Sequence, residues 1–217
     1  MTPFQRARKP EEKDERRQAI LLAARDLARE VGVRDLSLNE LGRRSGVSKP
    51  NIYRYFESLE EVLFRLFIHE LEEVVEEVDA SLGAAAGDVP SVAAQLTRVY
   101  LARPLFCQLL GMMSATIEHN LSVETIASGK AEMYTLFARV VEALARALPW
   151  LSAADAAWAS QSIALYVAAL WPAANPSCAA VEVLGRPEFA ALKPDAARDL
   201  GRFVEVLLTG LAALDPR

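Results

Sequence analysis

The stretch from Ser37 to Phe56 constrains the fold more than any other part of the sequence, because its pattern is that of two short helices joined by a tight turn. Ser37 and Glu40 stand three residues apart, which is the spacing of a capping box. The apolar Leu38 follows the cap directly. These signals predict a first helix that begins at Leu38 and ends near Ser45.

The second half of this stretch has the signals of a helix that follows immediately. Gly46 can take the left-handed conformation that turns the chain, and Ser48 is suited to cap the next helix. Pro50 fits its first turn, where a missing N–H has no intrahelical partner to lose. We expect this helix to extend to Phe56, with Ile52 and Phe56 facing inward. The outward residues would be Lys49, Asn51, Tyr53, Arg54 and Tyr55, whose donors and rings suit phosphates and base edges of DNA.

The charge of the chain is divided unevenly along its length. The 217 residues have a formal net charge of -5, but residues 1–55 hold 13 Lys and Arg against 8 Asp and Glu. Residues 56–217 hold 11 against 21. Because phosphate binding depends on the local field, the basic N-terminal part is the part suited to a polyanion.

Other features limit the classes of function. Cys107 and Cys178 form no disulfide framework and have no metal-ligand spacing, so we expect no metal site, no cofactor and a reducing, cytoplasmic setting. The N-terminus lacks the apolar core of a signal peptide. The most apolar run, Ala153–Ala174, contains polar residues, and we interpret it as a buried or subunit-contacting helix, with no membrane partner.

The whole chain has the pattern of an all-α protein, since no segment alternates as a strand does. Capping boxes and prolines delimit the expected helices. They are about 14–31, 38–45, 49–56, 59–82, 90–102, 105–119, 123–148, 153–171 and a last helix from Asp195, with an irregular stretch before it. The 59–82 helix would span roughly 36 Å, which is more than a small DNA-binding domain needs, so it should connect two parts.

The segment VSKPNIYRYFESLEEVL, preceded by SLNELGRRSG, resembles the TetR family of bacterial transcriptional repressors. In that family a valine-serine pair opens the recognition helix, a tyrosine lies near its centre and a phenylalanine ends it, as Val47, Ser48, Tyr53 and Phe56 do here. The resemblance is specific over about residues 17–66, and beyond them it concerns the architecture alone.

The resemblance implies a division of the chain into parts with different roles. Residues 1–13 would be a flexible basic arm, 14–57 a three-helix helix-turn-helix DNA-binding domain, 58–82 a connecting helix, and 83–217 a helical ligand-binding and dimerisation domain. The arm is either a solvated tail or a segment that enters a minor groove through Arg6, Arg8 and Lys9.

Particular residues are implied as DNA contacts. Ser37 and Ser48 would touch phosphates, and Lys49, Pro50, Asn51, Tyr53 and Tyr55 would form the main DNA-facing surface. Arg17, Arg43 and Arg44 are either further contacts or a solvated charged face. Two positions depart from the family: Tyr55 stands where histidine is usual, and Leu59 where a phosphate-contacting lysine is usual. The Tyr55 hydroxyl can still donate a hydrogen bond.

The implied partners are a palindromic operator in double-stranded DNA, a second copy of the chain, and a small-molecule effector. In a dimer two recognition helices must lie about 34–36 Å apart to enter successive major grooves, so an effector that tilts the 59–82 helix would change DNA affinity. The C-terminal part has aromatic, methionine and polar side chains that would suit a mostly apolar effector. The alternative is that these side chains simply fill the hydrophobic core. They are Tyr100, Phe106, Met112, Met113, His119, Tyr134, Phe137, Trp158 and Gln161.

The dimer is expected to form through the last helix and the 153–171 helix, which are apolar on more than one face and carry small residues such as Ala156 and Gly210. Enzymatic function has little support, because the chain has no HExxH motif, phosphate loop or serine nucleophile motif. His119 beside Glu118 is the one suggestive pair. A helical enzyme or a ligand-independent interaction protein is the alternative class.

Overall fold

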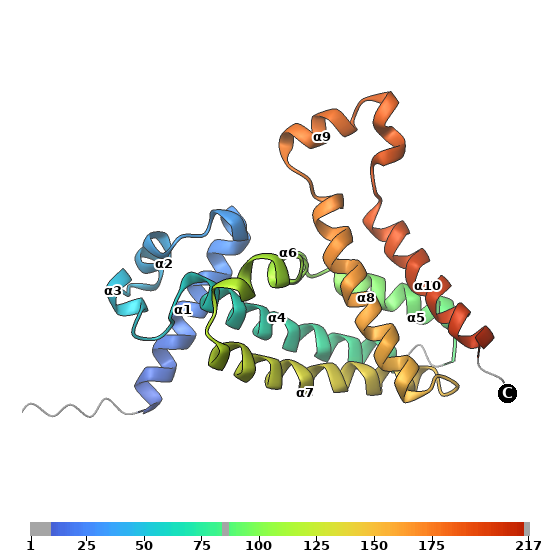
Figure 1. The fold of residues 1–217 in the computed structure, drawn as a ribbon, viewed down its shortest axis with the longest axis horizontal. Helices are drawn as coiled ribbons and strands as arrows, with labels where there is room; N and C mark the ends of the chain where they lie inside the picture. Colours follow the sequence, from blue (N-terminus) through green and yellow to red (C-terminus); the bar gives the residue numbers. More distant parts are fainter. Residues whose placement is uncertain (1–9, 84–86, 215–217) are drawn as a thin grey trace, which may run out of the picture.

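The computed structural model describes residues 10–83 and 87–214, and within these ranges the chain is helical throughout, as the sequence predicts (Figure 1). The expected arm therefore lies largely outside the described residues. The elements are α1 (Pro10–Val31), η1 (Val33–Asp35), α2 (Leu38–Ser45), α3 (Lys49–Ile52), α4 (Leu59–Leu82), α5 (Val89–Leu101), α6 (Pro104–Met112), η2 (Met113–Ile117), η3 (Glu118–Asn120), α7 (Val123–Ala147), α8 (Ala153–Ala174), α9 (Cys178–Leu184), η4 (Pro187–Leu192) and α10 (Ala196–Leu214).

Helices α1, α2 and α3 form a small unit at one end of the molecule (Figure 1). Its core consists of fully buried apolar residues from each helix, including Ile20, Leu27, Leu41 and Ile52. Burying this shared apolar surface stabilises three helices of which two are too short to be stable alone. Helix α1 begins at Pro10, four residues before the predicted start.

Helix α4 connects this unit to the rest of the chain. Its 24 residues pack against α1 at one end and against α5, α6 and α7 along its length (Figure 1). Gly129 of α7 permits the closest approach, because a Cβ there would lie 2.2 Å from Cε1 of Phe64. The predicted connecting helix therefore also lies at the centre of the larger part, where α5, α6 and α7 pack against it.

The predicted helix starts are confirmed by side-chain caps. The Ser58 hydroxyl accepts from the Glu61 amide at 3.1 Å, that of Ser122 from Thr125 at 3.2 Å, and that of Ser152 from Asp155 at 3.1 Å. Each bond satisfies an amide that has no partner inside its helix. Three of the four long helices of the larger part thus begin at the residues predicted from the sequence, which are 59, 123 and 153.

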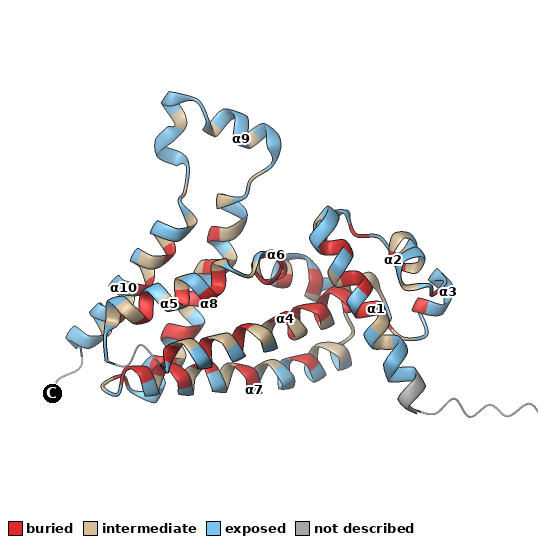
Figure 2. Cartoon of the chain, turned by 180° about the vertical axis from the view of Figure 1, so that it is seen from behind, coloured by how far each residue is buried: buried red, intermediate tan, exposed pale blue. Residues whose placement is uncertain are grey.

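Three further predictions of secondary structure are wrong in the larger part. Helix α6 ends at Met112, where the chain continues as the π-helical η2 and then η3, so the predicted helix to His119 is broken into three pieces. Helix α8 continues through Pro172 to Ala174. The stretch predicted as irregular contains α9 and η4. These two elements project from the body, and their residues are mostly exposed (Figures 1 and 2).

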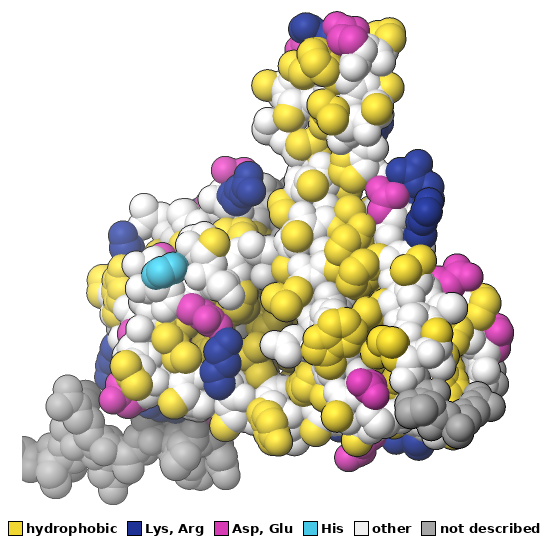
Figure 3. All heavy atoms as spheres, turned by 45° about the vertical axis from the view of Figure 1, so that its right-hand side comes forward, with side chains coloured by type: hydrophobic (Ala, Val, Ile, Leu, Met, Phe, Trp, Pro, Cys, Tyr) yellow, Lys and Arg dark blue, Asp and Glu magenta, His cyan; other side chains and the backbone are white. Residues whose placement is uncertain are grey.

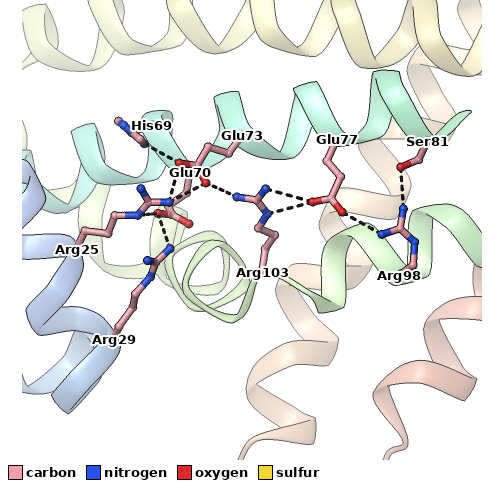
Figure 4. Close-up of polar contacts among 9 residues, drawn as sticks. All are labelled: Arg25, Arg29, His69, Glu70, Glu73, Glu77, Ser81, Arg98 and Arg103. Atoms are coloured by element: carbon pink, nitrogen blue, oxygen red, sulfur yellow. Dashed lines mark hydrogen bonds and ion pairs between the residues drawn. The ribbon is translucent and has the colours of Figure 1, made fainter. Parts of the chain in front are cut away.

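Arginines from α1, from α5 and from the position before α6 converge on the acidic edge of α4 (Figure 4). Arg25 of α1 donates to both carboxylate oxygens of Glu73 at 2.7 Å, and Arg103, which precedes α6, also donates to Glu73. Arg103 donates in addition to Glu77 at 3.2 Å, and Glu77 accepts from Arg98 of α5 at 3.0 Å. We call these five residues the α4 ion-pair chain. They join the N-terminal unit to α5 and α6 through α4.

The pKa of Glu73 reflects these contacts. Burial alone would raise the pKa of this carboxyl, but the hydrogen bonds from Arg25 and Arg103 outweigh it and lower the pKa below the ordinary value near 4.5. Because the pKa of Glu73 is lower in the folded than in the unfolded chain, its charged carboxylate stabilises the fold when the pH lies above the unfolded-state pKa. This stabilisation is lost as the pH falls through the folded-state pKa.

Replacing Glu73 by Gln should therefore lower the free energy of unfolding by about 1–2 kcal/mol at pH 7, because two arginines lose a charged acceptor. The difference from the parent chain should shrink as the pH falls below about 4.5, where the parent carboxyl gains its proton. Chemical denaturation at several pH values measures both effects. Glu76→Gln is the matched control, since Glu76 lies on the same helix and is exposed. Equal stabilities of the two variants at pH 7 would contradict the role of Glu73.

Candidate functional site

The turn between α2 and α3 is formed by local features that the sequence predicts. The Ser37 hydroxyl accepts a hydrogen bond from the Glu40 amide at 3.3 Å, so the predicted N-cap is confirmed, while the Glu40 carboxylate accepts from Arg43 and does not complete the capping box. Gly46 ends α2 with φ 67°, a left-handed conformation that glycine adopts without a steric penalty. Gly42 meets the backbone of the turn, because a Cβ there would lie 2.8 Å from the Val47 carbonyl oxygen. Ser37 thus fixes the start of α2, and the two glycines allow the close turn from α2 into α3.

The segment that follows is helical for a shorter distance than predicted. Helix α3 ends at Ile52, and Tyr53, Arg54 and Tyr55 form a turn before α4. The predicted helix to Phe56 is therefore wrong in its last turn. The inward residues are as expected, since Ile52 and Phe56 are almost fully buried. They anchor the segment so that its other side chains remain outside.

The exposed side of this segment contains the main candidate residues. Ser48, Lys49, Pro50 and Asn51 are exposed, and Tyr53 keeps 51% of its surface exposed. Tyr55 is half-buried and packs against the core with part of its ring. The Ser48 side chain makes no capping hydrogen bond, and the Ser37 hydroxyl, which accepts in its cap, can still donate its proton. Six of the seven predicted residues thus lie between Ser48 and Tyr55, in or beside α3, and the seventh, Ser37, lies at the start of α2.

Arg43 and Arg44, two of the three candidate arginines, lie on exposed surface and are paired with acidic residues. Arg43 donates to Glu40 on its own helix, and Arg44 pairs with Glu30 of α1. Both pairs are exposed, so solvent screens them and they contribute little to stability. A phosphate could replace either carboxylate, and their role as DNA contacts stays a prediction.

Arg17 instead holds the segment after α3 in place. Its Nη1 donates to the Tyr55 carbonyl oxygen at 2.8 Å, and its guanidinium lies 4.6 Å from the centroid of the Phe56 ring. Its Nη2 lies 3.6 Å from a carboxylate oxygen of Glu61. A hydrogen bond, a cation–π contact and an ion pair together fix Arg17 as a clamp between α1, the turn and α4. Sequence reasoning missed this role because the partners lie 38 or more residues away.

Glu57 links this region to the larger part of the chain. Its carboxylate accepts from the Ser122 amide at the start of α7 at 3.0 Å, and its own amide donates to Glu61 at 2.6 Å. The hydrogen bond from Ser122 lowers the pKa of Glu57 below its ordinary value. The last residue before the α4 cap is therefore tied to α7, a contact that no sequence motif indicates.

The nine residues predicted as ligand contacts are divided between the core and the surface. Tyr100, Phe106 and Met113 are buried in the core, where the Phe106 ring stacks on Phe67 with centroids 5.4 Å apart. Burial raises the pKa of Tyr100 to about 12. Phe137 is half-buried. Four others are exposed, namely His119, Tyr134, Trp158 and Gln161. The aromatic rings at the centre fill space against one another, and the ligand role of this set stays a prediction.

Two hollows among those formed by described residues have well-defined linings, and Met112 is the one predicted ligand residue that lines either of these two. One is a shallow depression of about 390 Å³ between α8 and α10, where the rings of Tyr166 and Phe203 stack at 4.0 Å. The other, of about 440 Å³, lies between η1, α6 and the end of α8. Sequence reasoning identified neither, because their walls come from distant segments.

Apolar side chains gather on one face of α8 and α10. Leu165 keeps 65% and Val206 keeps 63% of its surface exposed, and Trp158 keeps 53%. Figure 3 shows apolar side chains along this face of α8 and α10, up to the projecting part that contains α9. Ala156 is buried inside the chain and Gly210 is exposed, so the small residues named from the sequence are divided between core and surface. Several large apolar side chains exposed on neighbouring helices are typical of a protein contact.

Comparison with known proteins places these features in a family. The model of the bacterial regulatory proteins of the tetR family matches residues 20–66, and the model described as the tetracyclin repressor-like C-terminal domain matches residues 69–214. Together they span both the helix-turn-helix and the larger helical part. The chain belongs to the TetR family. Family members are regulatory proteins and not enzymes, as the absence of catalytic motifs predicts.

One curated TetR-family protein is similar to part of the chain. The chain is 37% identical over 73 residues to the HTH-type transcriptional regulator EthR of Mycobacterium tuberculosis, an alignment that covers 34% of this chain and 32% of that protein. The chain thus aligns with about a third of the length of this curated relative.

Solved TetR-family structures resemble the whole fold. A putative transcriptional regulator from Rhodococcus sp. RHA1 has a TM-score of 0.61 at 15% identity, with 90% of this chain and 94% of that chain covered. A TetR variant from Acinetobacter baumannii AYE, solved in complex with minocycline, has a TM-score of 0.58 at 16% identity, with 91% and 97% covered. At these identities the likeness concerns the fold.

Remaining observations concern metals, thiols and membranes. The described residues contain no group of three or more metal-ligating side chains. Cys107 is buried, which raises the pKa of its thiol to about 12, and Cys178 is exposed. No single described helix is long and apolar enough to cross a membrane; one pair, α8 and α9, meets that length and composition only together and is bent by 83°.

Replacing Gly42 by Ala should lower the free energy of unfolding by about 1–3 kcal/mol, because the added methyl group would push against the Val47 carbonyl and open the turn. Thermal and chemical unfolding measure this change. Gly83→Ala is the control, since a Cβ there would meet its nearest neighbour at an ordinary 3.7 Å. If the Gly42 variant is as stable as the Gly83 variant, the close approach does not define the turn.

Proposed function

We propose that this TetR-family chain is a ligand-responsive, DNA-binding transcriptional regulator of the bacterial cytoplasm. In this proposal it is a repressor that binds a palindromic operator as a homodimer and is released when a small, largely apolar molecule binds the C-terminal part. The observation that carries the proposal is the exposed polar face around α3, held outward by the buried Ile52 and Phe56.

The charges of this face support phosphate binding. Lys49 and Arg54 are exposed and form no ion pair with any described residue, whereas Arg43 and Arg44 are paired. An unpaired cation can release counterions from DNA without first giving up a protein partner. Asn51 and Tyr53 lie between them in the sequence and offer hydrogen-bonding groups for base edges and phosphates.

The apolar face of α8 and α10 supports the homodimer. Two copies that bury Leu165, Val206 and the stacked pair Tyr166 and Phe203 would cover the shallow depression between these helices. A two-fold axis there would also present two α3 segments to DNA, as a palindromic operator requires.

The response to a small molecule is supported by the way the helices are joined. The unit of α1–α3 is attached to the larger part through α4, the α4 ion-pair chain and the Glu57 contact with α7. An effector that prefers one arrangement of these helices would shift the population toward it and change the spacing of the α3 segments. The likeness to a fold solved with minocycline supports an effector of small-molecule size.

Replacing Lys49 by Ala should weaken binding to DNA of every sequence by a similar factor and reduce the slope of log K against log salt by about one counterion. Fluorescence anisotropy with a selected palindromic site and with a scrambled duplex, each at several salt concentrations, measures both effects. Lys193→Ala is the control, because Lys193 is exposed and follows η4, far from α3 along the chain.

An unchanged salt slope for the Lys49 variant would remove this residue from the phosphate contacts. If neither the parent chain nor the Lys193 variant binds a duplex more tightly than about 10⁻⁴ M at physiological salt, DNA binding as such is refuted.

Replacing Leu165 and Val206 by Glu together should convert the dimer to a monomer, because the face between α8 and α10 would then bury two uncompensated charges. Light scattering or sedimentation at micromolar concentration measures the mass. Val123→Glu is the matched control, since Val123 keeps 77% of its surface exposed on α7 outside this face. A parent chain that is monomeric at micromolar concentration would contradict the dimer, and a dimer that survives the double substitution would place its interface elsewhere.

A further inference from the structure

The second cavity lies where the N-terminal unit meets the larger part of the chain. It has a volume of about 440 Å³, within the range of small-molecule sites. One wall is formed by the end of α1 and by η1, and the opposite wall by α6 and the end of α8. We call it the junction cavity. Its polar and aromatic lining includes Arg34, Asp35, Gln108, Met112, Trp171 and Asn175.

The wall formed by α6 and α8 is held in place by a close helix contact. Gly111 faces the Ala168 carbonyl, because a Cβ at Gly111 would lie 3.0 Å from that oxygen and 3.6 Å from Cδ of Pro172. Pro172 has no N–H to give to the Ala168 carbonyl, the acceptor four residues earlier. The glycine and the proline thus bring α6 and α8 together next to the cavity, and this wall is formed without a ligand.

The lining combines a flat apolar surface with free hydrogen-bonding groups. The side chains of Met112 and Trp171 are each half-buried, and a flat ring packs well against a thioether and an indole. The Gln108 amide makes no hydrogen bond to any described residue. The Asn175 amide donates to the Trp171 carbonyl at 3.0 Å, which leaves its own carbonyl oxygen free to accept.

The charges at the cavity differ from those nearby. Arg25 and Arg29 of α1 lie close to Glu70 or Glu73, and Arg44 pairs with Glu30. Arg34 and Asp35 form no ion pair with any described residue, although both line the cavity. Because one is positive and the other negative, their fields largely cancel for a ligand between them. The lining therefore favours a neutral molecule over an anion or a cation.

We propose that the junction cavity binds a neutral, flat aromatic molecule that carries an amide-like hydrogen-bonding edge, and that this molecule is an effector of the chain. Its ring lies on Met112 and Trp171, and its edge exchanges hydrogen bonds with Gln108 and Asn175. The site is separate from the set that includes Trp158 and Gln161, whose side chains are exposed elsewhere on α8.

Binding there acts on the N-terminal unit directly. Element η1 leads from α1 to α2, and the buried Val33 fixes it to the core of that unit, while η1 also packs against α6. A ligand between η1 and α6 contacts both parts and stabilises the arrangement that fits it best. The effect on DNA affinity rests on the proposed function, whereas the binding itself does not.

The test follows the three tryptophans of the full-length chain. With ¹⁵N-labelled tryptophan each indole N–H gives one NMR signal, assigned by substitution of Trp150, Trp158 and Trp171 by Phe in turn. Indole-3-carboxamide and quinoline-3-carboxamide are the probes, and cyclohexanecarboxamide, which keeps the amide without the flat ring, is the comparison. The aromatic probes should shift the Trp171 signal with saturation and leave the Trp158 signal in place.

Substitutions test whether the probe binds in this cavity or elsewhere on α8. Gln108→Leu and Asn175→Leu should each weaken probe binding about tenfold, the effect of losing one well-formed hydrogen bond. Gln161→Leu is the matched control and should leave binding unchanged. Thermal unfolding of the variants verifies that each is folded, and the exposed Asn175 gives a second test if the Gln108 variant is unstable.

The outcomes distinguish the site from the proposed function. A Trp171 signal that stays in place up to the solubility limit of both aromatic probes, or binding that survives both leucine variants, overturns the site. Saturating probe should also weaken DNA binding of the parent chain at least threefold, and the same loss in the Gln108 variant should need about tenfold more probe. An unchanged DNA affinity overturns the effector role. Absence of DNA binding without any probe refutes the proposed function and leaves the NMR result standing.

Discussion

Glu73 of α4 accepts hydrogen bonds from arginines that belong to different parts of the chain, Arg25 of α1 and Arg103 before α6. The apolar face of α4 holds its neighbours together without much directional preference, because burial depends on area and not on orientation. Charge-assisted hydrogen bonds to arginine are directional and lose strength when the geometry changes. The α4 ion-pair chain therefore sets how α1 and α6 lie relative to each other, and the placement of α3 depends on it.

Local chemistry made much of this fold predictable from the sequence. Ser37, Ser58, Ser122 and Ser152 cap helices because each hydroxyl reaches an amide three residues ahead, a contact that needs no other part of the chain. The interior position of Pro172 was not predictable in this way. A proline normally ends a helix, and here the packing of α8 against α6 near Gly111 supports the helix beyond it.

In the candidate site, too, features that depend on neighbouring residues were predictable and features that depend on distant residues were not. Exposure of Lys49 and Asn51 follows from the burial of Ile52 and Phe56 within one short segment, and sequence periodicity reveals such a pattern. The clamp at Arg17 depends on partners far along the chain. A list of aromatic residues likewise cannot distinguish a ring that fills the core, as Phe106 does, from one that lines a cavity. Contacts between distant segments decide these cases, and no spacing in the sequence encodes them.

Helix α6 is linked to the N-terminal unit near both of its ends, directly to η1 and, through Glu73 of α4, to Arg25 of α1. At the start of α6, Arg103 shares Glu73 with Arg25, while toward its end Gln108 and Met112 face η1 across the cavity. A helix of nine residues is only about 13 Å long, so these two links lie close together. In the proposed mechanism a ligand in the cavity acts on η1 near the end of α6, while the contacts of Arg25 and Arg103 with Glu73 hold the start of α6. The N-terminal unit is then tied to the larger part at two separate points, and a ligand that changed their relation would change the direction of α3 as well as its distance from a partner copy.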